Sequence, residues 1–315
     1  MKNEARSCEF RTTIGGQALM EGILMRGPKK QAIVCRTADG LVEKVEDLKL
    51  VKDSHPILGL PFIRGVVTLF DSLFKGMQAL TWSASLLPPE QQGEPDKLDQ
   101  WIEAHFEAEK AQKLIISTAV VLGVALAAFL FIFLPAFIIG FITPLKEHLF
   151  LRNISEGVLR IVILLVYMRF ICGVGEVKRL FSYHGAEHKT IFCYEHGKEL
   201  TVENVRDESR FHPRCGTSFL LVVIVVSILV NSVVRLDNSF ARMGCHLLLL
   251  PVVVGISYEI NRWCGRHDNF LSAALSAPGK WLQHMTTNEP DDGMIECAIR
   301  SLELVIPEEK GSDAW

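Results

Sequence analysis

Two histidines and a glutamate stand close together in the sequence His184-Gly-Ala-Glu-His188. Residues four positions apart lie on the same face of an α-helix, so the imidazoles of His184 and His188 would stand side by side, with Glu187 offset around the helix. Two neutral imidazoles can bind a zinc-like ion, and a nearby carboxylate can accept and return a proton. The spacing matches His-x-x-Glu-His, the inverted zinc-peptidase pattern. Histidines that only form structural hydrogen bonds at a helix end are the alternative interpretation.

A catalytic zinc ion has three protein ligands and one position open to water, so the histidine pair needs one more ligand. Three residues later in the chain have suitable side chains: His212, Cys215 and Glu259. Inverted-motif peptidases also draw a glutamate from well downstream, which favours Glu259, but a histidine or a cysteine is equally suitable chemically. Further candidates of the same types are Glu195, His196 and Glu203. In this scheme Glu187 is the general base that takes a proton from water and later returns it.

Each candidate for the third ligand also has a purely structural interpretation. Glu259 could form an ion pair with Arg262 or Arg169. His212 is followed by proline and could belong to a turn, and Cys215 is followed by glycine and could be a contact at a helix start. The two interpretations predict different positions for these side chains.

The composition favours a membrane protein. Of the 315 residues, 49% are apolar, which is high for a chain long enough to form two soluble domains. The net charge of −3 and the lack of a basic run argue against a nucleic-acid partner. The eight cysteines are scattered singly, so neither a four-cysteine zinc ribbon nor a thioredoxin-type pair fits. The first residues lack the apolar core of a signal peptide, so we expect the N-terminal region to belong to the mature protein.

Four apolar segments predict four transmembrane helices, at residues 114–142, 157–175, 219–234 and 245–260. The first is well beyond the roughly 20 residues that a bilayer core requires. The second is interrupted by two arginines, and the last two are short but strongly apolar. Lys and Arg are frequent before the first segment, in the connection at 176–218 and after residue 260, and sparse in the other two connections. The positive-inside rule therefore places both termini and the 176–218 loop in the cytoplasm.

The remaining segments predict soluble or interfacial structure around this four-span membrane domain of residues 114–260. Residues 1–54 form a β-rich cytoplasmic unit, in which a hairpin joins strand-like residues 31–36 and 41–45. Residues 55–113 hold an amphipathic helix, a proline-rich linker at 88–95 and a polar helix at 101–113. Residues 261–315 end in an amphipathic cytoplasmic helix, whose first turn carries the acidic residues Asp291 and Asp292. The expected fold class is thus mainly α: a polytopic membrane protein with about four transmembrane helices, a small N-terminal β-rich unit and amphipathic helices.

This topology brings the candidate ligands to one membrane face. The histidine pair follows the cytoplasmic end of the second span, His212 and Cys215 precede the third, and Glu259 lies at the cytoplasmic end of the fourth. Helices that cross a bilayer return the chain to the same surface, so long sequence separations are no obstacle.

Five motifs along the chain resemble the YqhQ-like family of bacterial multi-pass membrane proteins, a family of unknown function described as predicted metal-dependent enzymes. The motifs lie at residues 15–28, 183–190, 212–217, 255–259 and 286–292. The resemblance implies that His184, Glu187, His188, His212, Cys215 and Glu259 form one site. It also implies that Glu21 and Arg26 contribute to it, and it indicates no substrate.

We therefore expect a cell-membrane enzyme that depends on a divalent metal, zinc by preference, with its His-x-x-Glu-His site facing the cytoplasm. The expected reaction is hydrolysis of a peptide, an amide or a lipid-linked substrate at the bilayer surface. The alternative is a non-catalytic membrane scaffold or assembly factor that binds a protein partner.

Overall fold

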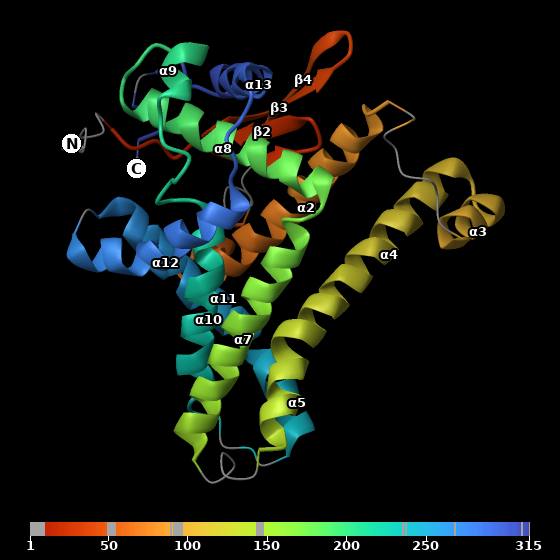
Figure 1. The fold of residues 1–315 in the computed structure, drawn as a ribbon, viewed down its shortest axis with the longest axis vertical. Coiled ribbons are helices and arrows are strands. Elements are labelled where there is room, and N and C mark those ends of the chain that lie inside the picture. Colours follow the sequence, from red (N-terminus) through yellow and green to blue (C-terminus); the bar gives the residue numbers. More distant parts are fainter. Residues whose placement is uncertain are drawn as a thin grey trace. The chain divides into compact units, whose positions relative to one another are not determined.

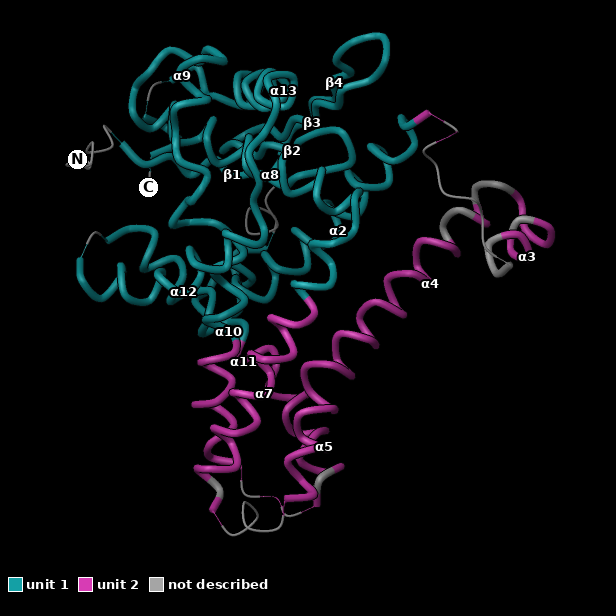
Figure 2. The backbone as a smooth tube through the Cα atoms, in the orientation of Figure 1, with its two compact units in different colours: residues 1–87, 168–223, 254–315 teal, residues 88–167, 224–253 magenta. Residues whose placement is uncertain are grey.

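Figure 1 shows the fold in a computed structural model, which describes residues 10–48, 55–88, 90, 97–142, 148–234, 236, 238–267, 269–309 and 311–314. The chain is mainly helical with one small antiparallel sheet near its N-terminus, as the sequence predicts. It divides into two compact units, each built from separate stretches of sequence (Figure 2). Unit 1 comprises residues 1–87, 168–223 and 254–315, and unit 2 comprises residues 88–167 and 224–253.

Four short strands form the sheet of unit 1 in the order β1-β2-β3-β4, each antiparallel to the next. They are β1 (Gly15–Leu19), β2 (Gly22–Arg26), β3 (Lys30–Thr37) and β4 (Gly40–Asp47). The predicted hairpin is confirmed as β3 and β4, with Gly40 at a φ of 124° in the turn. The glycine-rich segment before it forms the β1–β2 hairpin.

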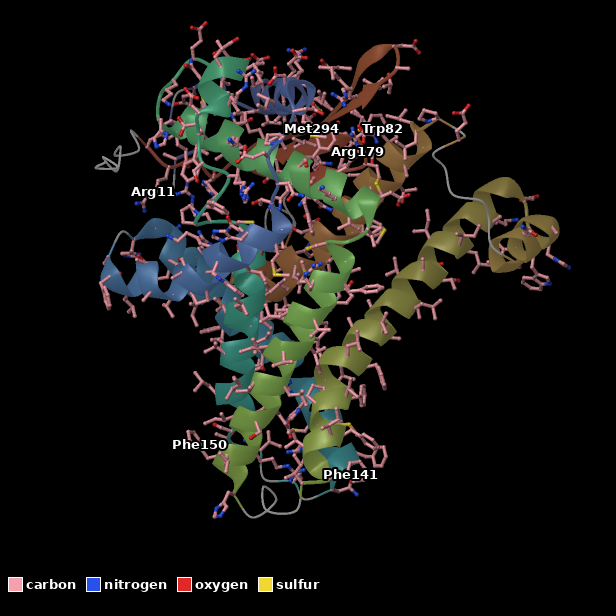
Figure 3. All side chains as sticks on the ribbon, viewed as in Figure 1. Arg11, Trp82, Phe141, Phe150, Arg179 and Met294 are labelled. Atoms are coloured by element: carbon pink, nitrogen blue, oxygen red, sulfur yellow. The ribbon has the colours of Figure 1, made fainter. Side chains whose placement is uncertain are left out.

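Helices cover both faces of this sheet. α8 (Gly175–Glu195) and α13 (Asp292–Glu303) pack on one face, and α2 (Ile63–Ser85) packs on the other. Met294 of α13 and Trp82 of α2, both labelled in Figure 3, belong to these two separate cores. Successive side chains of a strand point to opposite faces of the sheet. Because helices cover both faces, the side chains of β2 are buried along most of its length and not only at every second position.

Shorter helices connect these elements: η1 (Pro56–Gly59), α3 (Lys97–His105), α9 (Val202–Arg206) and α12 (Phe270–Thr286). Asp291 caps α13 by accepting a hydrogen bond of 2.8 Å from the Met294 backbone N–H, as expected for an acidic residue at a helix start. The polar helix predicted over residues 101–113 is interrupted, because α3 ends at His105 and the next helix begins at Ala108. The predicted linker at 88–95 lies mostly outside the described residues.

The apolar segments form α4 (Ala108–Ala128), continued by a π-helical turn and α5 (Leu134–Gly140), then α7 (Leu149–Ile171), α10 (Gly216–Asn231) and α11 (Ser239–Arg266). Within the described residues, Leu114–Gly140 and Phe240–Arg266 are long and apolar enough to cross a membrane. The bent pair α7 and α8 makes a third such segment if it counts as one span. By length and composition, the structure thus supports two to three spans where the sequence predicts four.

The ends of the helices differ from the predicted spans for local reasons. α7 stops at Ile171, short of the predicted residue 175, because the backbone turns at Gly173 before α8 begins. α11 includes the predicted segment 245–260 but extends beyond it at both ends and passes through Pro251.

Candidate metal centre

The His184-Gly-Ala-Glu-His188 motif lies on α8, and all its residues except the partly buried His184 are buried. Ala186 packs in the core shared with the sheet and α13. Gly185 meets the segment after α12, where a Cβ atom would collide with the backbone carbonyl of Asn288. The two small residues between His184 and Glu187 therefore let α8 lie close to its neighbours on both sides.

Three of the predicted ligands come together. One ligand atom from each of His184, His188 and Cys215 lies within 4.8 Å of the other two, the only such group among the described residues. His184 Nε2 is 3.2 Å from Cys215 Sγ, and the two imidazole centroids are 4.3 Å apart. Atoms bound to one zinc ion at about 2.0–2.3 Å must lie within roughly 4–5 Å of each other, so these three side chains meet the requirement.

Backbone carbonyls orient both imidazoles. His184 Nδ1 is 2.8 Å from the carbonyl oxygen of Thr286, and His188 Nδ1 is 2.6 Å from that of Arg210. A carbonyl oxygen only accepts hydrogen bonds, so each Nδ1 must carry the proton and donate it. In the neutral form of each ring, Nε2 then keeps its lone pair, as in histidines that bind zinc through one nitrogen while the other is held by the protein.

Polar contacts and positive charge favour a thiolate at Cys215. The backbone N–H of Thr217 donates to Sγ over 3.4 Å, and the Thr217 hydroxyl lies 3.2 Å away. Burial works against the charged form, but His188 and His184 outweigh it and hold the pKa of Cys215 well below its usual value. Burial also disfavours the charged form of His184 and by itself would lower its pKa. The contact with Cys215 outweighs this effect and raises the pKa of His184 to about 9.

Glu187 is buried beside these ligands, and the sheet holds it in place. Its Oε1 accepts a hydrogen bond of 3.0 Å from the backbone N–H of Gly16 on β1, whereas Oε2 has no partner among the described residues. Burial raises the pKa of the Glu187 carboxyl, with His184 and His188 partly opposing the shift. A carboxyl group with a raised pKa takes up a proton more readily than an ordinary glutamate does, as a general base must.

Gly16 is part of the site that the ligand motifs alone did not identify. A Cβ atom at this position would lie 2.7 Å from the Leu24 carbonyl oxygen and 3.0 Å from Glu187 Cδ. Glycine is therefore what allows β1 to approach Glu187. The run of glycines around position 16 was the signal for this close approach, but the sequence did not show what is approached.

His212 lies near the cluster but outside it. Its ring centroid is 5.6 Å from that of His188, while its Nε2 is 3.6 Å from Glu195 Oε2. Its backbone N–H donates to Gln283 Oε1 over 2.8 Å, and its Nδ1 accepts from the backbone N–H of Arg214. Burial lowers the pKa of His212 to about 4, although Glu195 opposes this. His212 thus holds the segment that leads to Cys215, and it is not one of the three residues whose ligand atoms gather.

The structure does not bring Glu259 into the cluster either. Its carboxylate forms a two-point ion pair with Arg64 of α2, in which Arg64 Nε donates to Oε1 over 2.7 Å. The pairing partner is therefore Arg64, and not Arg169 or Arg262 as considered from the sequence. Nearby, a Cβ atom at Gly255 would lie 2.7 Å from the Phe62 carbonyl oxygen. The motif at residues 255–259 therefore joins α11 to the start of α2.

The other predicted contributors also have partners outside the cluster of His184, His188 and Cys215. Glu21 pairs with Arg179 and accepts a hydrogen bond of 3.1 Å from the Tyr183 hydroxyl. Arg26 donates to Ser72 over 3.3 Å. The remaining candidates are Glu195, which pairs with Arg214, His196, which lies 3.0 Å from Glu208, and Glu203, which is exposed.

The last of the five family motifs, residues 286–292, crosses α8 next to His184 and Gly185. It supplies the Thr286 carbonyl to His184, and Glu289 forms an ion pair of 2.8 Å with the buried Lys189. Four of the five motifs thus have defined places in the structure near α8 or in the elements that hold it: residues 15–28, 183–190, 212–217 and 286–292.

Comparisons with known proteins agree with these motifs. The family described as "Protein of unknown function (DUF1385)" matches residues 60–308. The "Uncharacterized protein YqhQ" of Bacillus subtilis (strain 168) is 33% identical over 294 residues, which cover 91% of this chain and 90% of that protein. No solved structure matches the chain. The chain belongs to the DUF1385 family, and its similarity to YqhQ agrees with the YqhQ-like motifs in its sequence.

Proposed function

We propose that this protein is a metal-dependent hydrolase in which His184, His188 and Cys215 bind one zinc-like ion and Glu187 transfers protons. The observation that carries the proposal is the cluster of three ligand atoms within 4.8 Å, from histidines whose Nδ1 atoms are both held by backbone carbonyls. Three protein ligands are typical of catalytic zinc sites, which keep a position open for water or substrate.

The chemistry of the donor set supports zinc over a hard cation. Thiolate and imidazole ligands favour zinc and related transition metals, whereas magnesium and calcium prefer oxygen. When bound at such a site, a zinc ion acts as a Lewis acid and makes water more acidic. The buried thiolate and the two lone-pair nitrogens supply the negative charge and the softness that this ion prefers.

Glu187 would serve as the proton acceptor and donor. Gly16 holds one of its carboxylate oxygens, and the other is buried without a hydrogen-bond partner, so we assign the proton transfer to that oxygen. Its raised pKa brings proton uptake and release closer to neutral pH. The backbone N–H of Gly16 also keeps the carboxylate in one orientation, which lowers the cost of positioning it during the reaction.

We further propose a membrane location with both termini and the α8 segment on the cytoplasmic side. The distribution of Lys and Arg supports this orientation, and two to three apolar helices are available to cross the bilayer. Four crossings require α10, whose 16 residues are few for a bilayer core of ~30 Å, to serve as a short span. A site at the membrane surface suits a peptide, an amide or a lipid-linked substrate.

The test combines metal analysis with complementation of a deletion strain. We expect the full-length protein in detergent to contain about one zinc per chain, and His184→Ala or Cys215→Ser to lose it. Glu187→Gln should keep the metal but fail to complement, because only the proton-transfer group is changed. His267→Ala removes an exposed histidine that lies outside the cluster, and it should behave as wild type.

Two results would contradict the proposal. Wild-type protein that binds no stoichiometric metal would remove its basis. Full complementation by Glu187→Gln together with His184→Ala would favour the alternative, a non-catalytic scaffold or assembly factor.

The 3.2 Å contact between His184 Nε2 and Cys215 Sγ also supports a second candidate function, thiol-based catalysis. A thiolate beside an imidazolium is the usual arrangement of a nucleophilic cysteine. In that case His188→Ala would leave alkylation of Cys215 by iodoacetamide intact, and zinc would be absent. In the metal-dependent case, zinc protects Cys215 from alkylation and its removal by a chelator exposes the thiolate.

A further inference from the structure

Unit 2 buries three arginines among apolar helices. Arg152 and Arg160 belong to α7 and Arg242 belongs to α11, and they are 2%, 6% and 1% exposed. Glu156, one helical turn from each of the α7 arginines, is buried beside them. Among the described residues that these arginines contact, it is the only carboxylate, so the formal charge of the group is positive by two.

The contacts within this group fix the positions of the arginines but leave several of their N–H donors without a hydrogen-bond partner. Arg242 Nη2 lies 2.5 Å from Glu156 Oε1, and Arg152 Nε is 3.8 Å from the same oxygen. Arg160 Nη1 donates to the Ser227 hydroxyl over 2.8 Å, and its Nη2 lies 3.3 Å from His246 Nδ1. Glu156 is thus shared by two arginines, while Arg160 is left with neutral partners.

Most of the polar atoms left over in this group are hydrogen-bond donors. Within the described residues, no hydrogen-bond partner is present for Arg152 Nε and Nη2, Arg160 Nε, or Arg242 Nε and Nη1. A guanidinium only donates, so His246 Nδ1 must accept from Arg160, and the His246 proton then sits on Nε2, which also has no partner. The acceptors without a hydrogen-bond partner are Asn231 Oδ1 and Glu156 Oε1, and the latter is the oxygen that the arginines approach as an ion pair. Buried, unpaired cationic donors are strongly unfavourable unless an anion completes them.

The surroundings show that the group is built into the helix packing. A Cβ atom at Gly157 would collide with the Ile228 side chain, so α7 and α10 are closely packed beside Glu156. Asn153 donates to the Asn231 backbone carbonyl over 3.2 Å, which ties the same two helices together. Phe141 and Phe150, labelled in Figure 3, follow α5 and begin α7 at this end of unit 2.

We propose that Arg152, Arg160 and Arg242 form a binding site for a phosphate-type oxyanion within the apolar helices of unit 2. A phosphate group offers several oxygens to planar guanidinium groups and carries one to two negative charges, which matches an excess of two positive charges. The ligand is either free phosphate or the phosphate of a lipid headgroup that enters from the bilayer. All of these residues belong to unit 2, whereas the residues of the proposed metal site belong to unit 1.

The test uses the full-length protein in detergent, stripped of lipid, and two probes. In the first assay, inorganic phosphate is titrated while the unfolding temperature of the protein is measured. In the second, the protein is incubated with vesicles of a zwitterionic lipid with or without phosphatidylglycerol, and native mass spectrometry identifies the lipid that stays bound. We expect one probe to bind and to raise the unfolding temperature. Binding of inorganic phosphate indicates a free anion, and selective retention of phosphatidylglycerol indicates a headgroup.

Variants identify the site. Arg160→Gln should weaken binding of the effective probe by roughly tenfold or more, because it removes charge and a two-point donor. Arg169→Gln, which changes an exposed arginine on the same helix, is the matched control and should bind as wild type. Glu156→Gln should bind roughly tenfold more tightly, because the competing carboxylate is removed. This gain keeps the test decisive if arginine variants fold poorly.

One set of results would overturn the proposal. If folded wild-type protein binds neither probe and Glu156→Gln gains no binding, no oxyanion site is present. Glu147 and Asp237 lie in sequence near these helices but outside the described residues. If Asp237→Asn or Glu147→Gln then lowers the unfolding temperature sharply, the chain itself supplies the missing negative charge.

Discussion

Replacing His188 by asparagine separates metal binding from folding. The imidazole is 1% exposed, and its Nδ1–H donates to the Arg210 carbonyl over 2.6 Å. Truncation to alanine would leave that carbonyl without a donor at a cost of about 1–3 kcal/mol, whatever the metal does. The amide of an asparagine can replace the Nδ1 donor but has no nitrogen at the position of Nε2. His188→Asn should therefore fold and lose one of three ligands.

The size of the effect follows from linkage between binding and folding. Zinc held at a thousandfold excess over its dissociation constant stabilises the folded protein by about 4 kcal/mol. For a domain of about 200 residues, each kcal/mol shifts the unfolding temperature by about 2–4 °C. The wild type should therefore unfold about 8–16 °C higher with zinc than after chelation. His188→Asn should show a shift of only about 0–3 °C, since the remaining two ligands bind weakly.

Differential scanning fluorimetry of both proteins, with and without chelator, measures the two shifts, and elemental analysis gives the zinc content. Comparing each protein with itself cancels any cost of the substitution to folding. His284→Asn, at an exposed position on α12, is the matched control and should keep the full zinc-dependent shift. If His188→Asn retains both the wild-type zinc content and the wild-type shift, His188 is not a ligand and the assignment of the cluster fails.

Three further substitutions test the elements that hold the site. Gly185→Ala should destabilise the fold by at least about 1–3 kcal/mol in chemical denaturation, because its methyl group collides with the Asn288 carbonyl. An unchanged denaturation midpoint would show that the segment containing Asn288 moves aside at little cost. Asp291→Ala should cost about 1 kcal/mol through loss of the cap on α13 without changing zinc content; loss of zinc would show that the cap positions the ligands. The lowered pKa of His212 makes the unfolded state bind more protons between pH 6.5 and about 4, so stability should fall by up to ~3 kcal/mol as the pH drops through that range. Denaturation at several pH values should show a smaller fall in His212→Gln; equal falls in both proteins would assign the pH dependence to other groups.

Local patterns in the sequence predicted the parts of the site that depend on local structure. The spacing of four between His184 and His188 is a property of any α-helix, so their shared face followed from helix formation alone. The β3–β4 hairpin and the helical stripe that became α2 followed in the same way from alternation, a turn glycine and a period of three to four. The amphipathic segment at the C-terminus became α13 with the expected acidic cap.

The choice among the distant candidates could not be made from chemistry alone. His212, Cys215 and Glu259 all have ligand-type side chains, and their sequence positions predicted one membrane face for all three. Arg64 on a separate helix takes both oxygens of Glu259. Because that partner lies nearly two hundred residues away, no local pattern predicts the pairing.

The glycine-rich segment shows why the site needs the whole of unit 1. Gly16 lies on β1 and Gly185 lies on α8 itself: β1 approaches Glu187 through the first, and the chain after α12 passes over the second. That same passing segment gives its Thr286 carbonyl to His184. An N-terminal strand, a C-terminal crossing segment and the segment that bears Cys215 thus each orient one group of the cluster. An isolated α8 peptide could present two histidines on one face, but it could fix neither their tautomers nor the free oxygen of Glu187. The geometry of the proposed metal site is therefore a property of the folded unit, and variants of the two glycines should alter it without changing a proposed ligand.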